Sequence, residues 1–199
     1  HDVQRLDRLI SDISNVSRLD AELSREEMEK VDLKDLLLQL QDVYKKPIHR
    51  TKKEKKSAGD DDFNKVPIEI DIPDNKALYV NGSKDRLGQV FSNIIGNALS
   101  FSPENGHVHI TVKHKKNSFL ISVEDNGPGI PDNKIETIFE RFYTERPDHE
   151  EYGSHSGLGL SISKQIIEAH NGKIWAENIT NKSNQVIGAR FLVELKAAQ

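Results

Sequence analysis

The residues best suited to chemistry lie in one short stretch, Asp125-Asn126-Gly127-Pro128-Gly129-Ile130. The two glycines after Asp125 give the backbone access to positive φ and let a flat ligand approach without meeting a Cβ atom. The Asp125 carboxylate could accept a hydrogen bond from the exocyclic amine of adenine, whereas guanine carries a carbonyl there. Asn-Gly and Pro-Gly are also common turn formers, so an ordinary turn is the alternative for this stretch taken alone.

Asn93 and Asn97 lie one turn apart on a predicted helix, at the edge of its apolar stripe. Asparagine lowers helix propensity, so two of them in a core helix require a reason. The amide oxygen of Asn97 is a hard, neutral ligand that could bind Mg²⁺, with phosphate oxygens and water at the remaining positions. A pair of surface amides is the alternative.

Gly157 and Gly159 lie in the run Ser156-Gly157-Leu158-Gly159-Leu160, directly before a helix predicted at residues 161–170. Glycines at a helix N-terminus leave N–H groups unobstructed at the positive end of the helix dipole, which suits phosphate binding. Simple capping of the helix is the alternative.

The elements that must position these residues are strands and helices in the pattern of an α+β domain. Phe119, Ile121 and Val123 alternate in the run before Asp125, so the carboxylate emerges where a strand ends. The helix that carries both asparagines is predicted from about Lys84 to Phe101. Further strands are predicted at residues 68–72, 78–80, 107–113, 172–176 and 189–195, the last two as a hairpin, with a short helix at 135–142.

Two polar segments are predicted to be mobile. Residues 45–65 hold a basic run followed by Gly59 and three aspartates. The basic run could touch anionic lipid headgroups, and a solvated loop is the alternative. Residues 143–156 hold Pro147 and Gly153 and little to bury, as in a loop that moves.

Composition and charge restrict the classes of function. The chain has 199 residues, 35% of them apolar and 30% charged, enough for one good core plus appendages. A formal net charge of −4 argues against a general nucleic-acid binder. The absence of cysteine excludes disulfides and cysteine zinc sites. His107 and His109 share a strand face, but no third ligand lies nearby, so they are interpreted as surface or core histidines.

An amphipathic helix is predicted at residues 1–24, where apolar residues recur every three or four positions. Its apolar seam is expected to pack on a partner helix, and docking onto its own domain is the alternative. A second helix is predicted from Asp32, as N-cap, to about Tyr44. No apolar run approaches the ~20 residues that cross a bilayer. The start at His1, without Met and inside a helical pattern, indicates a piece of a longer protein.

Four motifs taken together resemble the N, G1, F and G2 boxes of sensor histidine kinases. They are Asn93-x-x-x-Asn97-Ala98, Asp125-x-Gly127-x-Gly129, Phe139-x-x-Phe142 and Gly157-x-Gly159-Leu160, in this order. Residues 1–24 resemble the second helix of that family's dimerisation and phosphoacceptor hairpin, so the resemblance covers essentially the whole chain. Residues 97–103 and 156–163 are similar to the ChvG-type membrane kinases of alphaproteobacteria, a group within this family.

The resemblance implies a Bergerat-type fold, a two-layer α/β sandwich with a mixed sheet and helices on one face, preceded by a long amphipathic helix. Residues 1–30 would be part of the hairpin and residues 31–199 the ATP-binding catalytic domain, with an ATP lid at residues 143–156. Asp125 would hold adenine, Asn97 would ligate Mg²⁺ and Asn93 would flank it. The other residues implied at the nucleotide are Phe101, Gly127, Gly129, Ile130, Gly157, Leu158, Gly159 and Leu160, with Arg141 and Arg146 as candidate γ-phosphate contacts.

The resemblance also implies a reaction and partners. ATP and Mg²⁺ would be bound, and the γ-phosphoryl group would pass to a histidine and then to an aspartate of a response regulator. Such transfer requires positioning and charge neutralisation from this domain. The parent would be a homodimer anchored in the inner membrane, with this portion in the cytoplasm. The family's phosphorylated histidine lies upstream of His1, which lacks the acid-Leu-Arg-x-Pro context of that residue. We therefore expect the chain to bind ATP–Mg²⁺ but not to phosphorylate itself.

Two positions depart from the family's pattern, and two other functions stay open. His155 stands where glycine is usual and Ser100 where lysine is frequent, which affects lid flexibility and one phosphate contact. Related ATPases such as gyrase and MutL carry Glu one helical turn before the Mg²⁺-binding Asn, as general base for water. Asn93 at that position cannot take a proton, so hydrolysis is expected to be slow. The third possibility is a nucleotide-binding module without catalysis.

Overall fold

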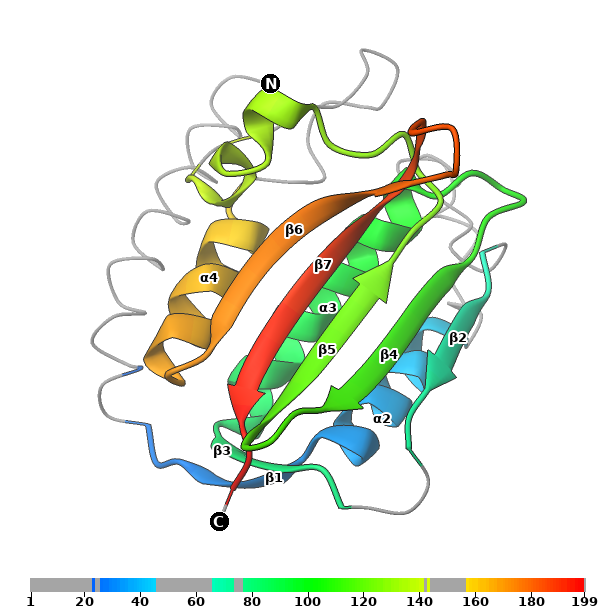
Figure 1. Cartoon of the computed structure of the whole chain (residues 1–199). Helices are drawn as coiled ribbons and strands as arrows, with labels where there is room; N and C mark the ends of the chain where they lie inside the picture. Colours follow the sequence, from blue (N-terminus) through cyan, green and yellow to red (C-terminus); the bar gives the residue numbers. More distant parts are fainter. Residues whose placement is uncertain are drawn as a thin grey trace, which may run out of the picture.

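A five-stranded mixed sheet in the order β2-β4-β5-β7-β6 is the main feature of the fold (Figure 1). The computed structural model describes residue 23 and residues 26–45, 66–73, 77–141, 143 and 157–198. The strands are β2 (Ile68–Asp71), β4 (Val108–His114), β5 (Ser118–Glu124), β6 (Lys173–Thr180) and β7 (Val186–Lys196). Strands β2 and β4 pair in parallel, and the other neighbours pair antiparallel.

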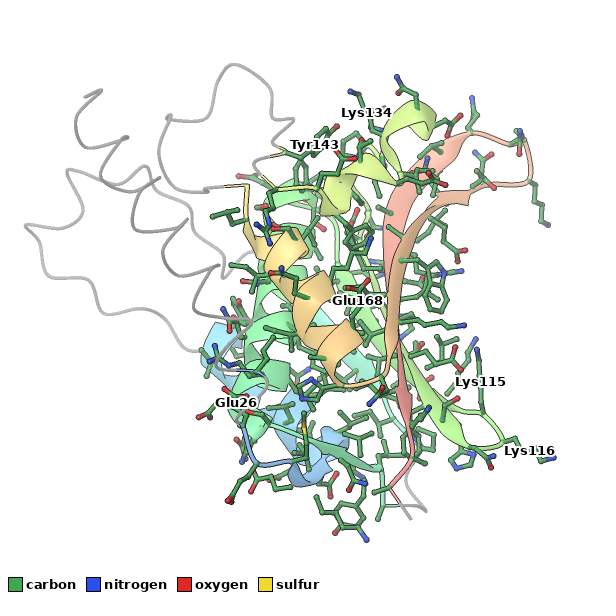
Figure 2. The ribbon with its side chains drawn as sticks, turned by 90° about the vertical axis from the view of Figure 1, so that its left-hand side faces the viewer. Glu26, Lys115, Lys116, Lys134, Tyr143 and Glu168 are labelled. Carbon is green, nitrogen blue, oxygen red and sulfur yellow. The ribbon has the colours of Figure 1, made fainter. Side chains whose placement is uncertain are left out.

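Three helices cover one face of this sheet. They are α2 (Leu33–Lys45), α3 (Lys84–Phe101) and α4 (Gly159–Ala169). The view turned by 90° shows them on the same side of the strands (Figure 2). Over the described ranges, the opposite face of the sheet carries no helix. This confirms the predicted α+β arrangement of two layers.

The core lies between the sheet and α3, because the apolar residues of α3 repeat at helical spacing on one side. Fully buried residues of this stripe are Leu87, Val90, Phe91, Ile94, Ile95 and Ala98. They meet the inward residues of β4 and β5, which are Val108, Ile110, Val112, Phe119, Ile121 and Val123. Each large apolar side chain in this layer contributes roughly 1.5–3 kcal/mol by leaving water. The helix that carries Asn93 and Asn97 is thereby fixed against the strand that precedes Asp125.

A second, two-stranded sheet closes the lower end of the molecule in Figure 1. Strand β1 (Glu29–Asp32) pairs antiparallel with β3 (Tyr79–Gly82), and Val80 also bridges to Ala197. Helix α2 begins directly after β1, and the Asp32 carboxylate accepts a hydrogen bond from the Lys34 N–H at 2.9 Å. This bond confirms Asp32 as the predicted N-cap. Strand β1 was not predicted, and it includes residues 29 and 30 of the range assigned to the hairpin.

The end of α4 is tied to the start of α3 by His170, which is buried. Its Nε2 accepts a hydrogen bond from the Ser83 N–H at 3.0 Å, and its Nδ1 lies 2.7 Å from the Ile166 carbonyl oxygen. Because Nε2 is the acceptor, the neutral ring carries its proton on Nδ1 and donates it to Ile166. The lower ends of the two helices are therefore held together by one imidazole.

Several predicted elements differ from the structure or fall outside its described ranges. The short helix predicted at residues 135–142 is wrong: the chain forms two 3₁₀ turns, η3 (Asp132–Lys134) and η4 (Thr137–Phe139). Ile138 and Phe139, which belong to η4, are buried. The predictions for residues 1–22, for the polar loop at 46–65 and for the lid at 144–156 lie outside the described residues. None of the described helices has the length and apolar character needed to cross a membrane.

Candidate nucleotide site

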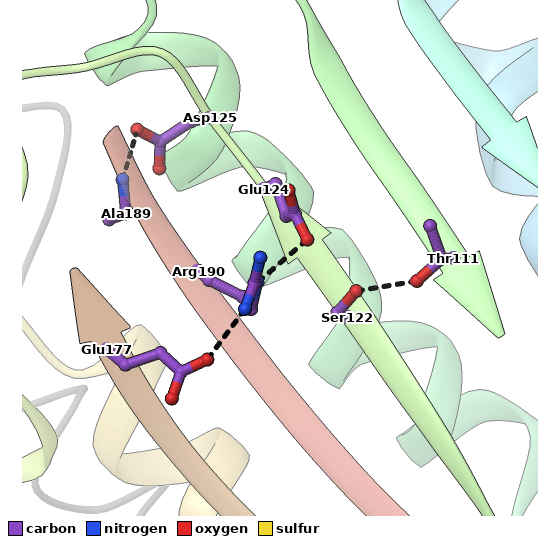
Figure 3. A network of polar contacts seen from close by, with 7 residues as sticks. All are labelled: Thr111, Ser122, Glu124, Asp125, Glu177, Ala189 and Arg190. Atoms are coloured by element: carbon purple, nitrogen blue, oxygen red, sulfur yellow. Dashed lines mark hydrogen bonds and ion pairs between the residues drawn. The ribbon is translucent and has the colours of Figure 1, made fainter. Parts of the chain in front are cut away.

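Asp125 follows directly after β5, and the residue is 4% exposed. Its Oδ1 accepts hydrogen bonds from two backbone N–H groups, that of Gly127 at 2.8 Å and that of Ala189 at 3.2 Å. Figure 3 shows the second of these bonds. Burial raises the pKa of the Asp125 carboxyl above its ordinary value of 3.8, and the two backbone bonds offset this only in part. The described residues give Oδ2 no hydrogen-bond donor, so this oxygen is the one that can accept a bond from a ligand.

The turn after Asp125 packs against the end of α3 and is bonded to His107, directly before β4. The Gly127 N–H closes an Asx turn onto Asp125. A Cβ at Gly127 would lie 2.7 Å from the Phe101 carbonyl oxygen at the end of α3, so a side chain cannot fit there. Asn126 Oδ1 accepts from the His107 N–H at 2.8 Å. The sequence is a turn, as its residue types indicate, and the turn presents a buried carboxylate.

Gly188 of β7 lies against the backbone of Asp125. A Cβ at this position would overlap the Asp125 carbonyl oxygen, so only glycine allows the approach. Next to it, Arg190 donates to Glu124 at 2.7 Å and to Glu177 at 2.9 Å on the outer face of the sheet (Figure 3). The two ion pairs join β5, β7 and β6 beside Asp125.

Asn93 connects α3 to the first turn of α4. Its Nδ2 donates to the Gly159 carbonyl oxygen at 3.1 Å and to Ser163 Oγ at 3.3 Å. A Cβ at Gly159 would lie 3.5 Å from the amide carbon of Asn93, so the two helices meet closely here. Asn93 therefore positions the start of α4, and the described part of the chain offers its Oδ1 no donor.

Asn97, one turn further along α3, is half-buried and makes no side-chain hydrogen bond with the described residues. Its amide oxygen is a hard ligand of the kind that Mg²⁺ binds. The described residues contain no group of three His, Cys, Asp or Glu that could hold a metal. A single amide oxygen fits a Mg²⁺ ion that keeps most of its ligands as phosphate oxygens and water, as Mg²⁺ usually does. The donor set therefore fits a nucleotide-bound Mg²⁺ ion.

Helix α4 begins at Gly159, two residues earlier than predicted. Gly157 has φ of 69°, a left-handed conformation that favours glycine. Leu158 is the N-cap residue, and no side chain caps the helix there. No described side chain therefore caps the first N–H groups of α4, which lie beside Asn93, an arrangement that fits an anion such as phosphate.

The remaining predicted residues lie at different places relative to the site. Leu158 is buried, Ile130 and Leu160 are half-buried against the core, and Phe101 is exposed at the end of α3. Arg141 is exposed near the end of the described segment, and no contact to the site is seen there for its guanidinium. Arg146 and His155 lie outside the described residues. Ser100 donates its hydroxyl to the Asn97 carbonyl oxygen at 3.0 Å.

Two positions of the site were missed by sequence reasoning. Gly188 was missed although a glycine inside a strand pattern is a signal for close approach of another backbone. Asn178 of β6 hydrogen-bonds both backbone groups of Ile130, 48 residues away. No local pattern announces a contact over this separation.

Comparison with known proteins agrees with this geometry. Residues 82–199 match the family described as histidine kinase-, DNA gyrase B- and HSP90-like ATPase. The sensor protein ChvG of Rhizobium meliloti (strain 1021) is 47% identical over 204 residues, covering 99% of this chain and 33% of that protein. The chain thus spans about a third of the length of such curated relatives.

Solved structures give the same result. The catalytic domain of histidine kinase ThkA matches with a TM-score of 0.65 and 29% identity, over 86% of this chain and 97% of that chain. A structure of ThkA in complex with the response regulator protein TrrA matches with a TM-score of 0.65 and 28% identity, over 98% of this chain and 49% of that chain. The sheet, its single helical layer and the buried carboxylate define an ATP-binding domain of the Bergerat type. The chain belongs to the histidine kinase-, DNA gyrase B- and HSP90-like ATPase family, in which it is a sensor histidine kinase catalytic domain of the two-component type.

Proposed function

We propose that this domain binds ATP with the adenine at Asp125 and the phosphates at the start of α4. The observation that carries the proposal is the Asp125 carboxylate, whose Oδ1 is occupied by two backbone N–H groups while Oδ2 has no donor among the described residues. The exocyclic amine of adenine can donate to that oxygen, and a bond to a carboxylate is stronger than one between neutral groups. Guanine presents a carbonyl oxygen instead, which the carboxylate repels.

Asn97, Gly157 and Gly159 are the residues proposed for the phosphate end. Asn97 Oδ1 would hold Mg²⁺, which neutralises phosphate charge as the γ-phosphoryl group leaves. The uncapped N–H groups of α4 would bind the phosphate chain. Arg141 and Arg146 are proposed as further contacts to the γ-phosphate.

The proposed reaction is phosphoryl transfer to a histidine and then to an aspartate of a response regulator. An imidazole nitrogen forms a bond to the γ-phosphorus, and the bond to the β–γ bridging oxygen breaks, so that ADP leaves with that electron pair. Asn93 is an amide and takes no proton, so water has no general base at this position and hydrolysis is expected to be slow. The match to ThkA, a kinase solved with a response regulator protein, supports a partner of that class.

The parent protein is proposed to be a membrane-anchored homodimer. Residues 1–30 are proposed to form part of a dimerisation hairpin, and residues 31–199 the catalytic domain with a lid at residues 143–156. The similarity to ChvG over 99% of this chain supports the same organisation.

Binding and transfer are tested separately. Calorimetric titration with AMP-PNP, with and without Mg²⁺, measures binding, and GTP serves as the control for base selection. Labelled ATP is then supplied to the chain alone, to the chain with a separately made hairpin that contains the phosphoacceptor histidine, and to the same hairpin with that histidine replaced by alanine.

We expect label only on the unmodified hairpin. Rapid release of free phosphate would instead identify a hydrolase of the wider family, and binding without transfer would identify a nucleotide-binding module. Label on the chain alone would contradict the expectation that it cannot phosphorylate itself.

A further inference from the structure

The side chain of Asn178 pairs with the backbone of Ile130 in both directions. Its Oδ1 accepts from the Ile130 N–H at 2.7 Å, and its Nδ2 donates to the Ile130 carbonyl oxygen at 2.7 Å. The amide thus makes the two bonds that a neighbouring strand would make. Nδ2 also lies 3.3 Å from Asp132 Oδ1. No other amino acid of this length supplies both a donor and an acceptor in this geometry.

These bonds close a frame around the Asp125 turn. Asn178 in β6 is the direct cross-strand partner of Ala189 in β7. Ala189 accepts from the Asp125 N–H at 3.0 Å and donates to Asp125 Oδ1 at 3.2 Å. Ala189 therefore fixes the first residue of the turn and Asn178 fixes the sixth, Ile130. The two anchors lie side by side in adjacent strands.

Gly129, the residue of the turn directly before Ile130, is under steric constraint. Gly129 has φ of 80°, and a Cβ there would lie 2.8 Å from Asn178 Oδ1 and would overlap Val186. Gly129 is therefore pressed between Asn178 and β7. Any loss of the Asn178 contacts frees the far half of the turn, while Asp125 itself keeps its own bonds.

We propose that Asn178 is a positioning residue of the nucleotide site, which holds Gly129 and Ile130 where they form the wall of the base pocket. This inference rests on the proposed function, because it concerns the base end of the same site. Asn178 lies on β6, and the side-chain bonds described for it go to Ile130 and Asp132, so it acts through the turn and not on the phosphates. Removal of the Asn178 side chain should therefore weaken nucleotide binding by the same factor with and without Mg²⁺.

Four variants in the full chain test the proposal. Asn178→Ala removes both bonds to Ile130. Asn178→Asp keeps the acceptor for the N–H but places an oxygen against the Ile130 carbonyl and Asp132. Asn181→Ala and Asn181→Asp are matched controls, since Asn181 is half-buried nearby and bonds only within the β6–β7 loop, to Ser183 and Gln185. The aspartate control also carries the added negative charge.

Binding of ADP is measured by calorimetry, with Mg²⁺ and with EDTA, at a temperature at which melting curves show each variant folded. Both Asn178 variants should bind ADP about tenfold more weakly, by the same factor in both conditions, because the turn is no longer held in its binding conformation. The alanine variant loses both bonds to Ile130, and the aspartate variant loses one and sets an oxygen against the Ile130 carbonyl. The Asn181 variants should bind as the unmodified chain does. A role in stability alone would lower the melting temperature and leave the affinity of the folded variants unchanged.

Three outcomes would overturn the proposal. They are unchanged affinity in both Asn178 variants, a loss seen only with Mg²⁺, and an equal loss in the Asn181 variants. Each of these leaves the proposed function standing if the unmodified chain binds ADP. Failure of the unmodified chain to bind any adenine nucleotide would instead remove the proposed function itself.

Discussion

At the scale of single residues, the two oxygens of Asp125 have different roles. Oδ1 is a structural acceptor that closes the turn at Gly127 and joins it to β7 at Ala189. Oδ2 is left for a ligand. Burial alone disfavours the charged form, and the raised pKa reflects this cost. Keeping this carboxyl group charged in a buried position therefore carries an expense in stability, as is common for groups selected for binding.

Asp125→Asn tests the role of Oδ2 in binding. The amide keeps an oxygen that can accept from both backbone N–H groups, but its NH₂ group would face the amine of adenine, donor against donor. We expect adenine nucleotides to bind about 10- to 100-fold more weakly, since a hydrogen bond to a charged group contributes roughly 1.5–3 kcal/mol. Calorimetry with ADP measures this. Unchanged affinity would reduce Asp125 to a turn residue.

The same substitution should raise stability, and the pH dependence gives the sign. A carboxyl whose pKa is raised on folding contributes stability fully below its ordinary value of 3.8, and loses that contribution as the pH rises through the raised value. The asparagine variant lacks this titration. Its advantage in free energy of unfolding should therefore grow through that window and then level off, as measured by urea denaturation at several pH values. A difference that does not vary with pH would contradict the assignment.

Asn93 and Asn97 are a matched pair for separating packing from ligand binding. Asn97→Ala removes no hydrogen bond among the described residues, and alanine favours the helix, so stability should stay equal or rise by a few tenths of a kcal/mol. The Mg²⁺-dependent part of ADP affinity should be lost.

Asn93→Ala removes the two bonds to α4 and should lower the free energy of unfolding by about 1–2 kcal/mol. Thermal melts and titrations with Mg²⁺ or EDTA measure both effects, and retained Mg²⁺ dependence in Asn97→Ala would return Asn97 to a surface amide.

The residues of the site were predictable where a local pattern carries the chemistry. The carboxylate at a strand end and the paired asparagines at helical spacing are such patterns, and the structure brings Asn93 to Gly159 and the end of α3 to Gly127. Asn178 was missed because its partner Ile130 is 48 residues away, and the tie made by His170 at the other end of the molecule was missed because Ser83 is 87 residues away. Such contacts depend on which strands are neighbours, and a single sequence does not contain that information.

At the scale of elements, the end of helix α3 and strand β7 pack against the Asp125 turn from two sides. Helix α3 was predicted at about Lys84 to Phe101, and the structure confirms it, because its long apolar stripe has the period of a helix. Strand β1 was missed because only one of its four residues is buried. The helix predicted at residues 135–142 was wrong because its apolar spacing fits a helix, whereas burial of Ile138 and Phe139 is achieved by two short 3₁₀ turns.

Gly188→Ala tests the fit of β7 against the Asp125 turn. The new Cβ would overlap the Asp125 carbonyl oxygen, so the strand or the turn must shift. We expect a loss of roughly 1–3 kcal/mol in the free energy of unfolding, as for an overpacked core, and weaker ADP binding. Gly88→Ala in α3 is the control, because its Cβ would lie 3.6 Å from Leu36 in ordinary contact. The control should gain about 0.5–1 kcal/mol from helix propensity and keep its affinity. Equal stability in the two variants would show that β7 does not restrain the turn.

At the scale of the whole molecule, the two ends of the sandwich are built differently. The lower end in Figure 1 is closed by the β1–β3 sheet, the bridge from Val80 to Ala197 and the imidazole of His170 between two helices. The upper end carries the turn after β5, the end of α3 and the start of α4, and it is held by hydrogen bonds of Asp125, Asn93 and Asn178. A ligand that bridges the turn and the start of α4 would therefore order the upper end more than the lower one.

Hydrogen–deuterium exchange with and without ADP and Mg²⁺ measures this difference. Amides in the interior of β4, β5 and β7 should exchange slowest in both states, because they lie in the centre of the sheet under the core. Addition of the nucleotide should slow exchange at residues 125–130 and in the first turn of α4, where N–H groups gain a ligand or a fixed partner. Residues 29–32 and 79–82 should exchange as before. Protection spread evenly over both ends would show that binding is coupled to global stability alone, and protection confined to the lower end would contradict the placement of the nucleotide at Asp125.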